Sequence, residues 1–159
     1  MTLIRTYFWI VLLSLTPLIE QRGAIPWGIF GEKLPPLTVF LVSYIASLLP
    51  VPIILLFFNA VFGLMKKYRW LDWFTGFIER KIRRKSARFE KYEEVALILF
   101  IGIPLPTTGI WTGSMIAAAL GFDIRKTLLC AALGGLLSAV AITLACTAFP
   151  GVAGLLGLT

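Results

Sequence analysis

Long apolar stretches alternate with short polar interruptions along this chain. Residues 3–19, 37–64, 95–120 and 127–149 contain a single charged residue between them, Arg5. A membrane helix needs about 20 consecutive apolar residues, so each stretch is long enough, or nearly so, to lie in a bilayer. The pattern predicts an all-α integral membrane protein, with residues 1–159 forming one polytopic membrane domain.

Two of the interruptions resemble each other. Residues 20–29 and residues 102–113 each place Ile-Pro, Gly and Trp beside the middle of a segment that otherwise has the composition of a membrane helix. Broken helices at corresponding places in two halves of a chain are the best sequence indication of a transporter binding site. Membrane transport is therefore the leading hypothesis.

The segment lengths favour opposed hairpins. We expect residues 3–34 and residues 95–120 to form re-entrant helical hairpins from opposite faces, because the pieces on either side of the second break are only half a bilayer long. Each hairpin is then followed by a transmembrane helix, residues 37–64 and 127–149, which makes two inverted repeats. The alternative is four ordinary spans with both termini in the cytoplasm.

Two details of the spans carry expectations of their own. Pro50 and Pro52 predict a kink or break within residues 37–64, because proline lacks the amide hydrogen that the helix needs. Gly134, Gly135 and Ser138 in the last span are small residues that permit close helix contact.

Charge supports this topology. Ten of the 15 Lys and Arg residues lie in residues 66–94, where aromatic residues recur at helical spacing. We expect this segment to be a cytoplasmic amphipathic helix at the membrane interface that joins the two repeats. The hairpin arrangement also places Arg125 and Lys126 on the cytoplasmic side, as the positive-inside rule prefers.

Composition excludes several classes of protein. The chain is 58% hydrophobic and 14% charged, whereas a soluble domain carries roughly a quarter charged residues. The net charge of +7 is better explained by membrane orientation than by nucleic-acid binding. There is no histidine, and Cys130 and Cys146 are typical of small buried hydrophobes, so we predict no metal site and no cofactor. Enzyme signatures are missing, and we expect a non-enzyme.

The first interruption carries the sharpest candidates for chemistry. A charge near the bilayer centre costs several kcal/mol unless it is paired or hydrated, so Glu20 and Arg22 are functional candidates. Glu20 would accept a coupling proton, and Arg22 would hold its carboxylate or bind an anionic headgroup. Gly23 and Pro26 would free backbone groups for coordination. The plain alternative is an extracytoplasmic loop with both charges in water.

The second interruption offers hydroxyls and amides in place of charges. Hydroxyls just before a helix that begins near Gly109 can cap it, and its free amides can bind an anion. The tryptophan and the threonine that follow would line an amphipathic cavity or anchor at the interface. The candidate residues here are Pro104, Pro106, Thr107, Thr108, Gly109, Trp111 and Thr112.

These two motifs resemble those of a known family. Glu-x-Arg-Gly-Ala-Ile-Pro at residues 20–26 and Ile-Pro-Leu-Pro at residues 103–106, followed by Thr-Gly-x-Trp-Thr-Gly at residues 108–113, look like the signatures of the putative small multidrug export proteins. That resemblance implies a compact protein of the prokaryotic inner membrane. The family is also distantly similar to the DedA, or VTT-domain, superfamily, which implies opposed re-entrant hairpins and transport of lipid carriers such as undecaprenyl phosphate. The chain departs from the DedA pattern in its second hairpin, which lacks charged residues.

Three functions remain open. The first is ion- or proton-coupled export of amphipathic small molecules, and the second is translocation of an anionic lipid headgroup. The third is a non-transporting role in membrane organisation through the basic segment. Four elements do not easily enclose two interrupted helices, since irregular backbone at membrane depth must be buried in protein or line a cavity. We therefore also expect a homo-oligomer, most simply a dimer.

Overall fold

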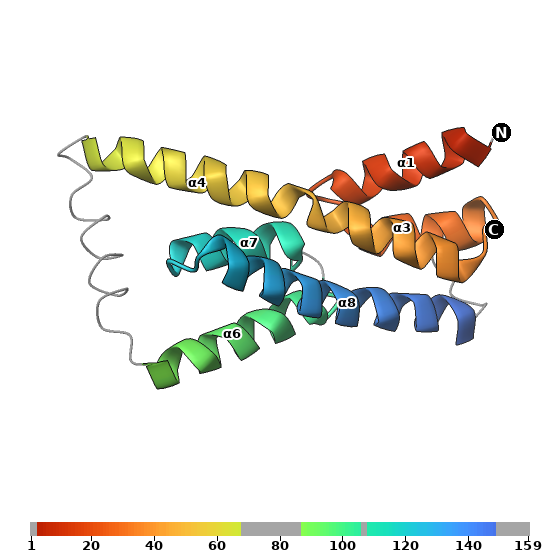
Figure 1. Ribbon diagram of the computed structural model, residues 1–159. Helices are drawn as coiled ribbons and strands as arrows, with labels where there is room; N and C mark the ends of the chain where they lie inside the picture. The colour runs from red at the N-terminus through yellow and green to blue at the C-terminus, as the bar shows by residue number, and fades with distance from the viewer. Residues whose placement is uncertain (1–2, 68–86, 106–107, 149–159) are drawn as a thin grey trace.

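The structure is a computed structural model that describes residues 3–67, 87–105 and 108–148, and all regular structure in these parts is helical (Figure 1). This confirms the all-α fold class. The helices, in chain order, are α1 (Leu3–Leu15), α2 (Glu20–Pro26), the π-helix η1 (Trp27–Gly31), α3 (Pro36–Leu48), α4 (Pro50–Lys67), α6 (Ala87–Gly102), α7 (Ile110–Ala119) and α8 (Ile124–Ala148).

Two helical segments in the described part are long and apolar enough to cross a membrane. They are Pro36–Phe58, which continues from α3 into α4, and Ile124–Ala148, which is α8. With 25 residues, α8 is about 37 Å long at 1.5 Å per residue. The first segment is interrupted at Leu49, directly before Pro50, where the proline pair predicted a break.

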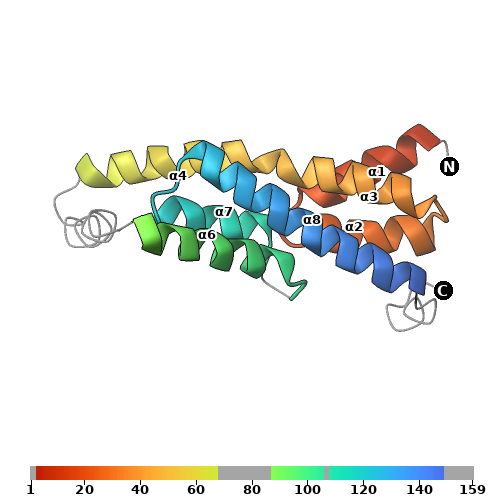
Figure 2. The ribbon, with the colours of Figure 1, turned by 60° about the horizontal axis from the view of Figure 1, so that its bottom comes forward.

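The remaining helices form two pairs that lie in opposite halves of the bundle. Figures 1 and 2 show α1 and α2 beside α3 in one half, and α6 and α7 beside α4 and the first part of α8 in the other. The long helix α8 passes through both halves and contacts α2, α3, α6 and α7. The turn between α1 and α2 and the connection between α6 and α7 face each other near the middle of the molecule, where α2 bonds to α7 and to the end of α6 (Figure 2).

Each half has its own apolar core. One core gathers residues of α4, α6, α7 and α8: Val51, Leu55, Leu97, Ile101, Ile110, Ala117, Phe122, Cys130 and Ala131. The other gathers residues of α1, α2, α3 and the later part of α8: Ile10, Ala24, Ile25, Val39 and Ala139. The two cores share no residue.

The first interruption differs from its expected form. Residues 20–31 are helical, and the break in the backbone is a turn at residues 16–19 instead. Proline disfavours helical backbone in the residue before it, so Pro17 ends α1 at Leu15, four residues earlier than expected. Pro26 is accommodated at the end of α2, where the chain continues as a wider π-turn closed by a bond from the Glu32 amide to the Trp27 carbonyl, 3.2 Å.

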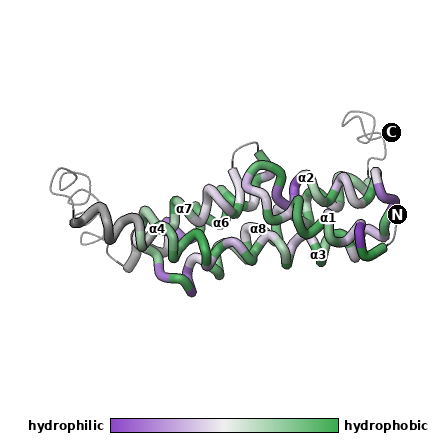
Figure 3. Tube along the Cα trace, turned by 90° about the horizontal axis from the view of Figure 1, so that it is seen from above, coloured by the Kyte–Doolittle hydropathy of each residue, from purple (hydrophilic) through white to green (hydrophobic). Residues whose placement is uncertain are grey.

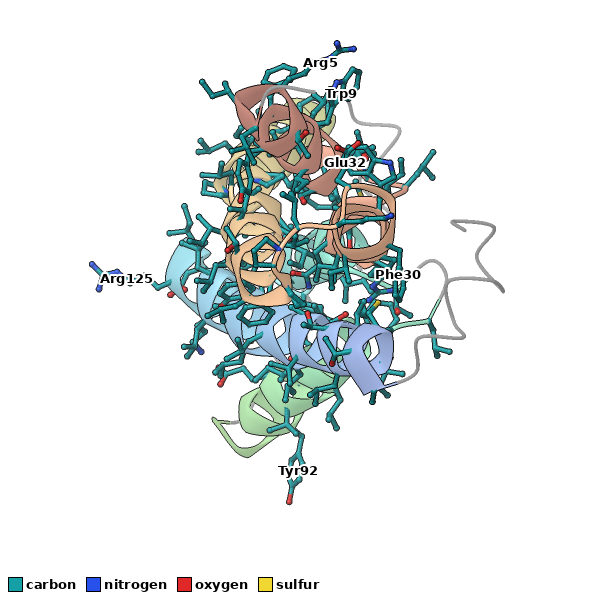
Figure 4. The ribbon with its side chains drawn as sticks, turned by 90° about the vertical axis from the view of Figure 1, so that its right-hand side faces the viewer. Arg5, Trp9, Phe30, Glu32, Tyr92 and Arg125 are labelled. Atoms are coloured by element: carbon teal, nitrogen blue, oxygen red, sulfur yellow. The ribbon has the colours of Figure 1, made fainter. Side chains whose placement is uncertain are left out.

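Polar residues gather at the two ends of the bundle and at its middle, beside α2 (Figure 3). The end of α4, the start of α6 and the α7–α8 turn share one end, and the start of α1 lies at the other (Figure 1). Arg5 and Arg125 project outward from the bundle (Figure 4). Residues 87–94, expected to belong to the interfacial segment, are the first turns of α6, whereas residues 68–86 of that segment lie outside the described residues.

Close contact between α6 and α8 depends on Gly134, as its small size predicted. A Cβ atom at Gly134 would lie 2.7 Å from the carbonyl oxygen of Ile98 and 2.7 Å from the Cβ of Ile101. Backbone and Cβ atoms cannot rotate away, so any side chain here would push the two helices apart.

We therefore expect Gly134→Ala to destabilise the protein by about 1–3 kcal/mol, the usual cost of overpacking. Ala145→Val, on the exposed face of the same helix, adds carbon without a close neighbour to displace and should change stability little. Thermal unfolding of both variants in a neutral detergent compares them. Equal melting temperatures would contradict the close α6–α8 contact.

Candidate functional site

The polar middle of the bundle is built by the first turn of α2. Glu20, Gln21 and Arg22 are consecutive, and successive residues of a helix point about 100° apart. Their side chains therefore reach different partners: Glu20 reaches α7, Gln21 reaches α3 and α8, and Arg22 reaches the end of α6 and the connection that follows it.

Glu20 caps the N-terminus of α7. Its Oε2 accepts a hydrogen bond from the Ile110 amide at 3.3 Å, and its Oε1 accepts one from the Trp111 amide at 3.0 Å. The first amides of a helix have no partner within the helix, and a negative charge there is favoured by the helix dipole. Glu20 is only 5% exposed, and α7, whose N-cap residue Gly109 has no side chain to cap it, receives this cap from α2.

The backbone of Glu20 is held in an unfavourable conformation. Its φ is 49°, in the left-handed region that residues other than glycine rarely adopt. Such a conformation costs of order 1–3 kcal/mol and persists where surrounding structure compensates for it. The two hydrogen bonds from α7 to the Glu20 carboxylate offset this cost. The strained backbone is therefore maintained by the contact between the two helix pairs.

Gly109 provides the space that the Glu20 carboxylate fills. A Cβ atom at Gly109 would lie 2.7 Å from Oε1 and 2.8 Å from Cδ of Glu20, and it would contact Oε2 as well. The φ of Gly109 is 176°, an extended conformation open to any residue. Glycine is therefore required here by the close approach of the carboxylate.

Arg22 binds the C-terminal end of α6 in a complementary way. Its Nη2 donates to the carbonyl oxygens of Ile101 (3.1 Å) and Ile103 (3.4 Å), and its Nη1 donates to the Leu105 carbonyl and to the Thr108 hydroxyl (3.0 Å). The last carbonyls of a helix lack partners, and a cation is favoured there. We call these four oxygen atoms the oxygen nest.

Gln21 was not singled out from the sequence. Its side chain is 1% exposed, its Nε2 donates to the Gly135 carbonyl at 2.8 Å, and its Oε1 accepts from the Ser47 hydroxyl at 3.2 Å. It thereby ties the first helix pair to both long segments. The available signal was an amide side chain between two charges in an otherwise apolar region.

A cavity of about 760 Å³, which we call the junction cavity, opens between the two helix pairs beside the first turn of α2. Seven of the predicted site residues line it, together with four that were not predicted, three from the α1–α2 turn and Leu105. Its lining residues are Pro17, Leu18, Ile19, Glu20, Arg22, Gly23, Pro104, Leu105, Thr108, Gly109 and Thr112.

The other predicted residues are placed differently. Pro26 is buried one turn further along α2, and Trp111 contributes its backbone amide to Glu20. Pro106 and Thr107 lie outside the described residues. Among the described residues there is no cluster of three or more His, Cys, Asp or Glu side chains that could hold a metal ion.

One protein family matches this chain. Its sequence profile, described as "Putative small multi-drug export protein", matches residues 20–141. This range includes both interruptions and the first turn of α2 with its bonding partners. The chain belongs to this family. The small multi-drug export family assignment and the two long apolar helical segments together indicate a membrane protein. Searches of curated proteins and of solved structures found no match.

Gly109→Ala tests whether the carboxylate cap holds the family's two motifs together. The new methyl group would displace the Glu20 carboxylate from α7, and we expect a loss of about 1.5–3 kcal/mol, the usual range for hydrogen bonds to a charged group. Melting temperatures of the purified protein measure this loss. Gly31→Ala is the matched control, because its Cβ would meet only the Trp27 ring, at an ordinary 3.5 Å. Equal effects of the two changes would contradict the capping role.

Proposed function

We propose that the protein is a small membrane transporter that exports amphipathic molecules in exchange for protons or other ions, with the junction cavity as its binding site. The observation that carries the proposal is the Glu20 carboxylate on the first amides of α7, at the edge of that cavity. Glu20 is titratable, and it holds together α2 and α7, the two elements between which a substrate would pass.

The proposal includes opposed re-entrant hairpins. The bilayer core is about 30 Å thick, whereas α1 has 13 residues and α7 has 10, or about 20 and 15 Å at 1.5 Å per residue. Neither is long enough to span, and their turns face each other midway along the long helices (Figure 2). Non-helical backbone at that depth is tolerated where it lines a cavity, as it does here.

The contacts support two inverted repeats. In the first repeat along the chain α1 and α2 pack on α3, and in the second repeat α6 and α7 pack on α8. Each pair also reaches across, since α2 contacts α8 and α7 contacts α4. The described ends that carry Lys67, Arg125 and Lys126 lie together, which under the positive-inside rule is the cytoplasmic side (Figure 1).

Coupling follows from the chemistry of the cap. An ionised Glu20 attracts the positive end of the α7 dipole, and protonation removes that charge and weakens the hold. The strained backbone of Glu20 then favours release of the turn. Protonation would thus loosen the contact between the helix pairs on one side of the transport cycle, and deprotonation would restore it.

The alternative of an anionic lipid headgroup has less support. Arg22 and the α7 amides are the groups that would bind a phosphate, and both are engaged within the protein.

A homodimer stays part of the proposal. Leu18 is 96% exposed at the mouth of the cavity, and a second copy would cover this edge. Cross-linking in native membranes that found monomers alone would argue against the dimer.

Glu20→Gln keeps the shape of the side chain but removes its charge and its proton exchange. We expect proton-linked export from proteoliposomes to fall to background, while the protein still folds. Glu32→Gln is the control, because Glu32 accepts a bond from Thr6 at the end of the bundle, away from the cavity, at 3.1 Å. Unchanged proton-linked flux in the Glu20 variant would overturn the coupling role.

Cysteine accessibility tests the hairpins, in a protein whose Cys130 and Cys146 are replaced by alanine. Cysteines at Lys33 and Arg125 should react with a membrane-impermeant maleimide from opposite faces. A cysteine at Leu18 should react from neither face, because the turn would lie at membrane depth, in lipid or against the second copy. Rapid labelling at position 18 from the face that labels position 33 would show an aqueous loop and contradict the re-entrant turn.

A further inference from the structure

The oxygen nest around Arg22 is a complete cation-binding group. Its acceptors are the carbonyls of Ile101, Ile103 and Leu105 and the hydroxyl of Thr108, all within hydrogen-bond distance of one guanidinium. The Thr108 hydroxyl is itself oriented by the Leu105 carbonyl, at 2.9 Å. These oxygen atoms belong to residues at the end of α6 and in the connection that follows it, and α2 contributes the guanidinium that they bind.

Arg22 occupies the nest from another helix, and incompletely. Its Nε is buried and has no hydrogen-bond partner among the described residues. The guanidinium is therefore held through its two terminal nitrogens, while the side chain as a whole is only half-buried and lines the cavity. Such an occupant is replaceable, because it can move into the cavity while an incoming cation makes the same bonds to the nest.

The cavity leads to the nest. Arg22, Leu105 and Thr108 all line it, so half of the nest's acceptors belong to residues that a cavity ligand would touch. The rest of its lining includes Pro17, Leu18 and Pro104, which are apolar and exposed. A ligand with a cationic head and an apolar tail matches this division of surfaces.

We propose that the oxygen nest is the head-group site for exported cations of the guanidinium or amidinium type, and that Arg22 is a tethered occupant which such a cation displaces. The nest already accepts the planar fork of donors of the Arg22 guanidinium, so a ligand head group with the same planar N–H donors matches the positions of its acceptors. This inference rests on the proposed function and names its substrate class.

Displacement makes an unusual prediction about affinity. A tethered side chain competes with a free ligand at an effective concentration in the millimolar range. Removing it by Arg22→Ala should therefore tighten binding of a matching cation, by about tenfold or more. If Arg22 instead recognised an anionic head group, the same change would weaken binding of anions and leave cations unaffected.

The test measures equilibrium binding to the purified full chain in maltoside micelles by calorimetry. The probes are octylguanidinium, its neutral counterpart octylurea, and octyl sulfate, each below its micelle concentration. We expect octylguanidinium to bind the wild-type protein and to bind Arg22→Ala at least tenfold more tightly, with little binding of the other two. Arg125→Ala is the matched control, since Arg125 projects away from the bundle (Figure 4), and it should match the wild type.

A second arm covers an Arg22→Ala variant that does not fold. Thr108→Val removes one acceptor while Arg22 stays, and it should weaken octylguanidinium binding severalfold. Equal binding of octylguanidinium to wild type, Arg22→Ala and Thr108→Val would overturn the nest, as would preferential binding of octyl sulfate that Arg22→Ala abolishes.

The two proposals can fail separately. Octylguanidinium binding with the expected order of variants, but without any flux in proteoliposomes, would reject transport and retain the nest. Flux that depends on Glu20 but involves no guanidinium binding would retain transport and reject the nest.

Discussion

The structure depends on one constraint: broken helices inside an apolar region leave amides and carbonyls that must find partners in the protein. Here the α7 amides receive the carboxylate of Glu20, and the α6 carbonyls receive the guanidinium of Arg22. Both charges lie on α2, in the other helix pair. The same bonds therefore satisfy the second break and join the two helix pairs, and both charges have partners inside the bundle.

The position of the cavity follows from the same constraint. The two apolar cores share no residue, and the first turn of α2 joins the two helix pairs through directional hydrogen bonds. Gln21 anchors that turn to Gly135 and Ser47, so the junction is fixed to both long segments. Space remains where the two helix pairs meet, and it lies beside the buried carboxylate of Glu20.

Much of this could be read from the chain. The helical class, the break at Pro50, the close contact through Gly134 and the need of Glu20 and Arg22 for partners all followed from composition, proline chemistry and the cost of buried charge. The family match confirmed the resemblance of the two motifs. The prediction for the form of the first interruption was wrong. Pro17 breaks the helix before Glu20, whereas Pro26 lies within a helix that widens into a π-turn.

By itself the sequence determined which segments are apolar, where prolines prevent continuous helices and which charges would be costly in a membrane, since these are properties of single residues and their neighbours. Only the tertiary structure decided which helix end each charge reaches. The oxygen nest consists of three backbone carbonyls and one hydroxyl, and backbone acceptors leave no trace in residue identity. The need for glycine at position 109 is likewise set by a carboxylate 89 positions earlier in the chain, a contact that exists only once the two pairs meet.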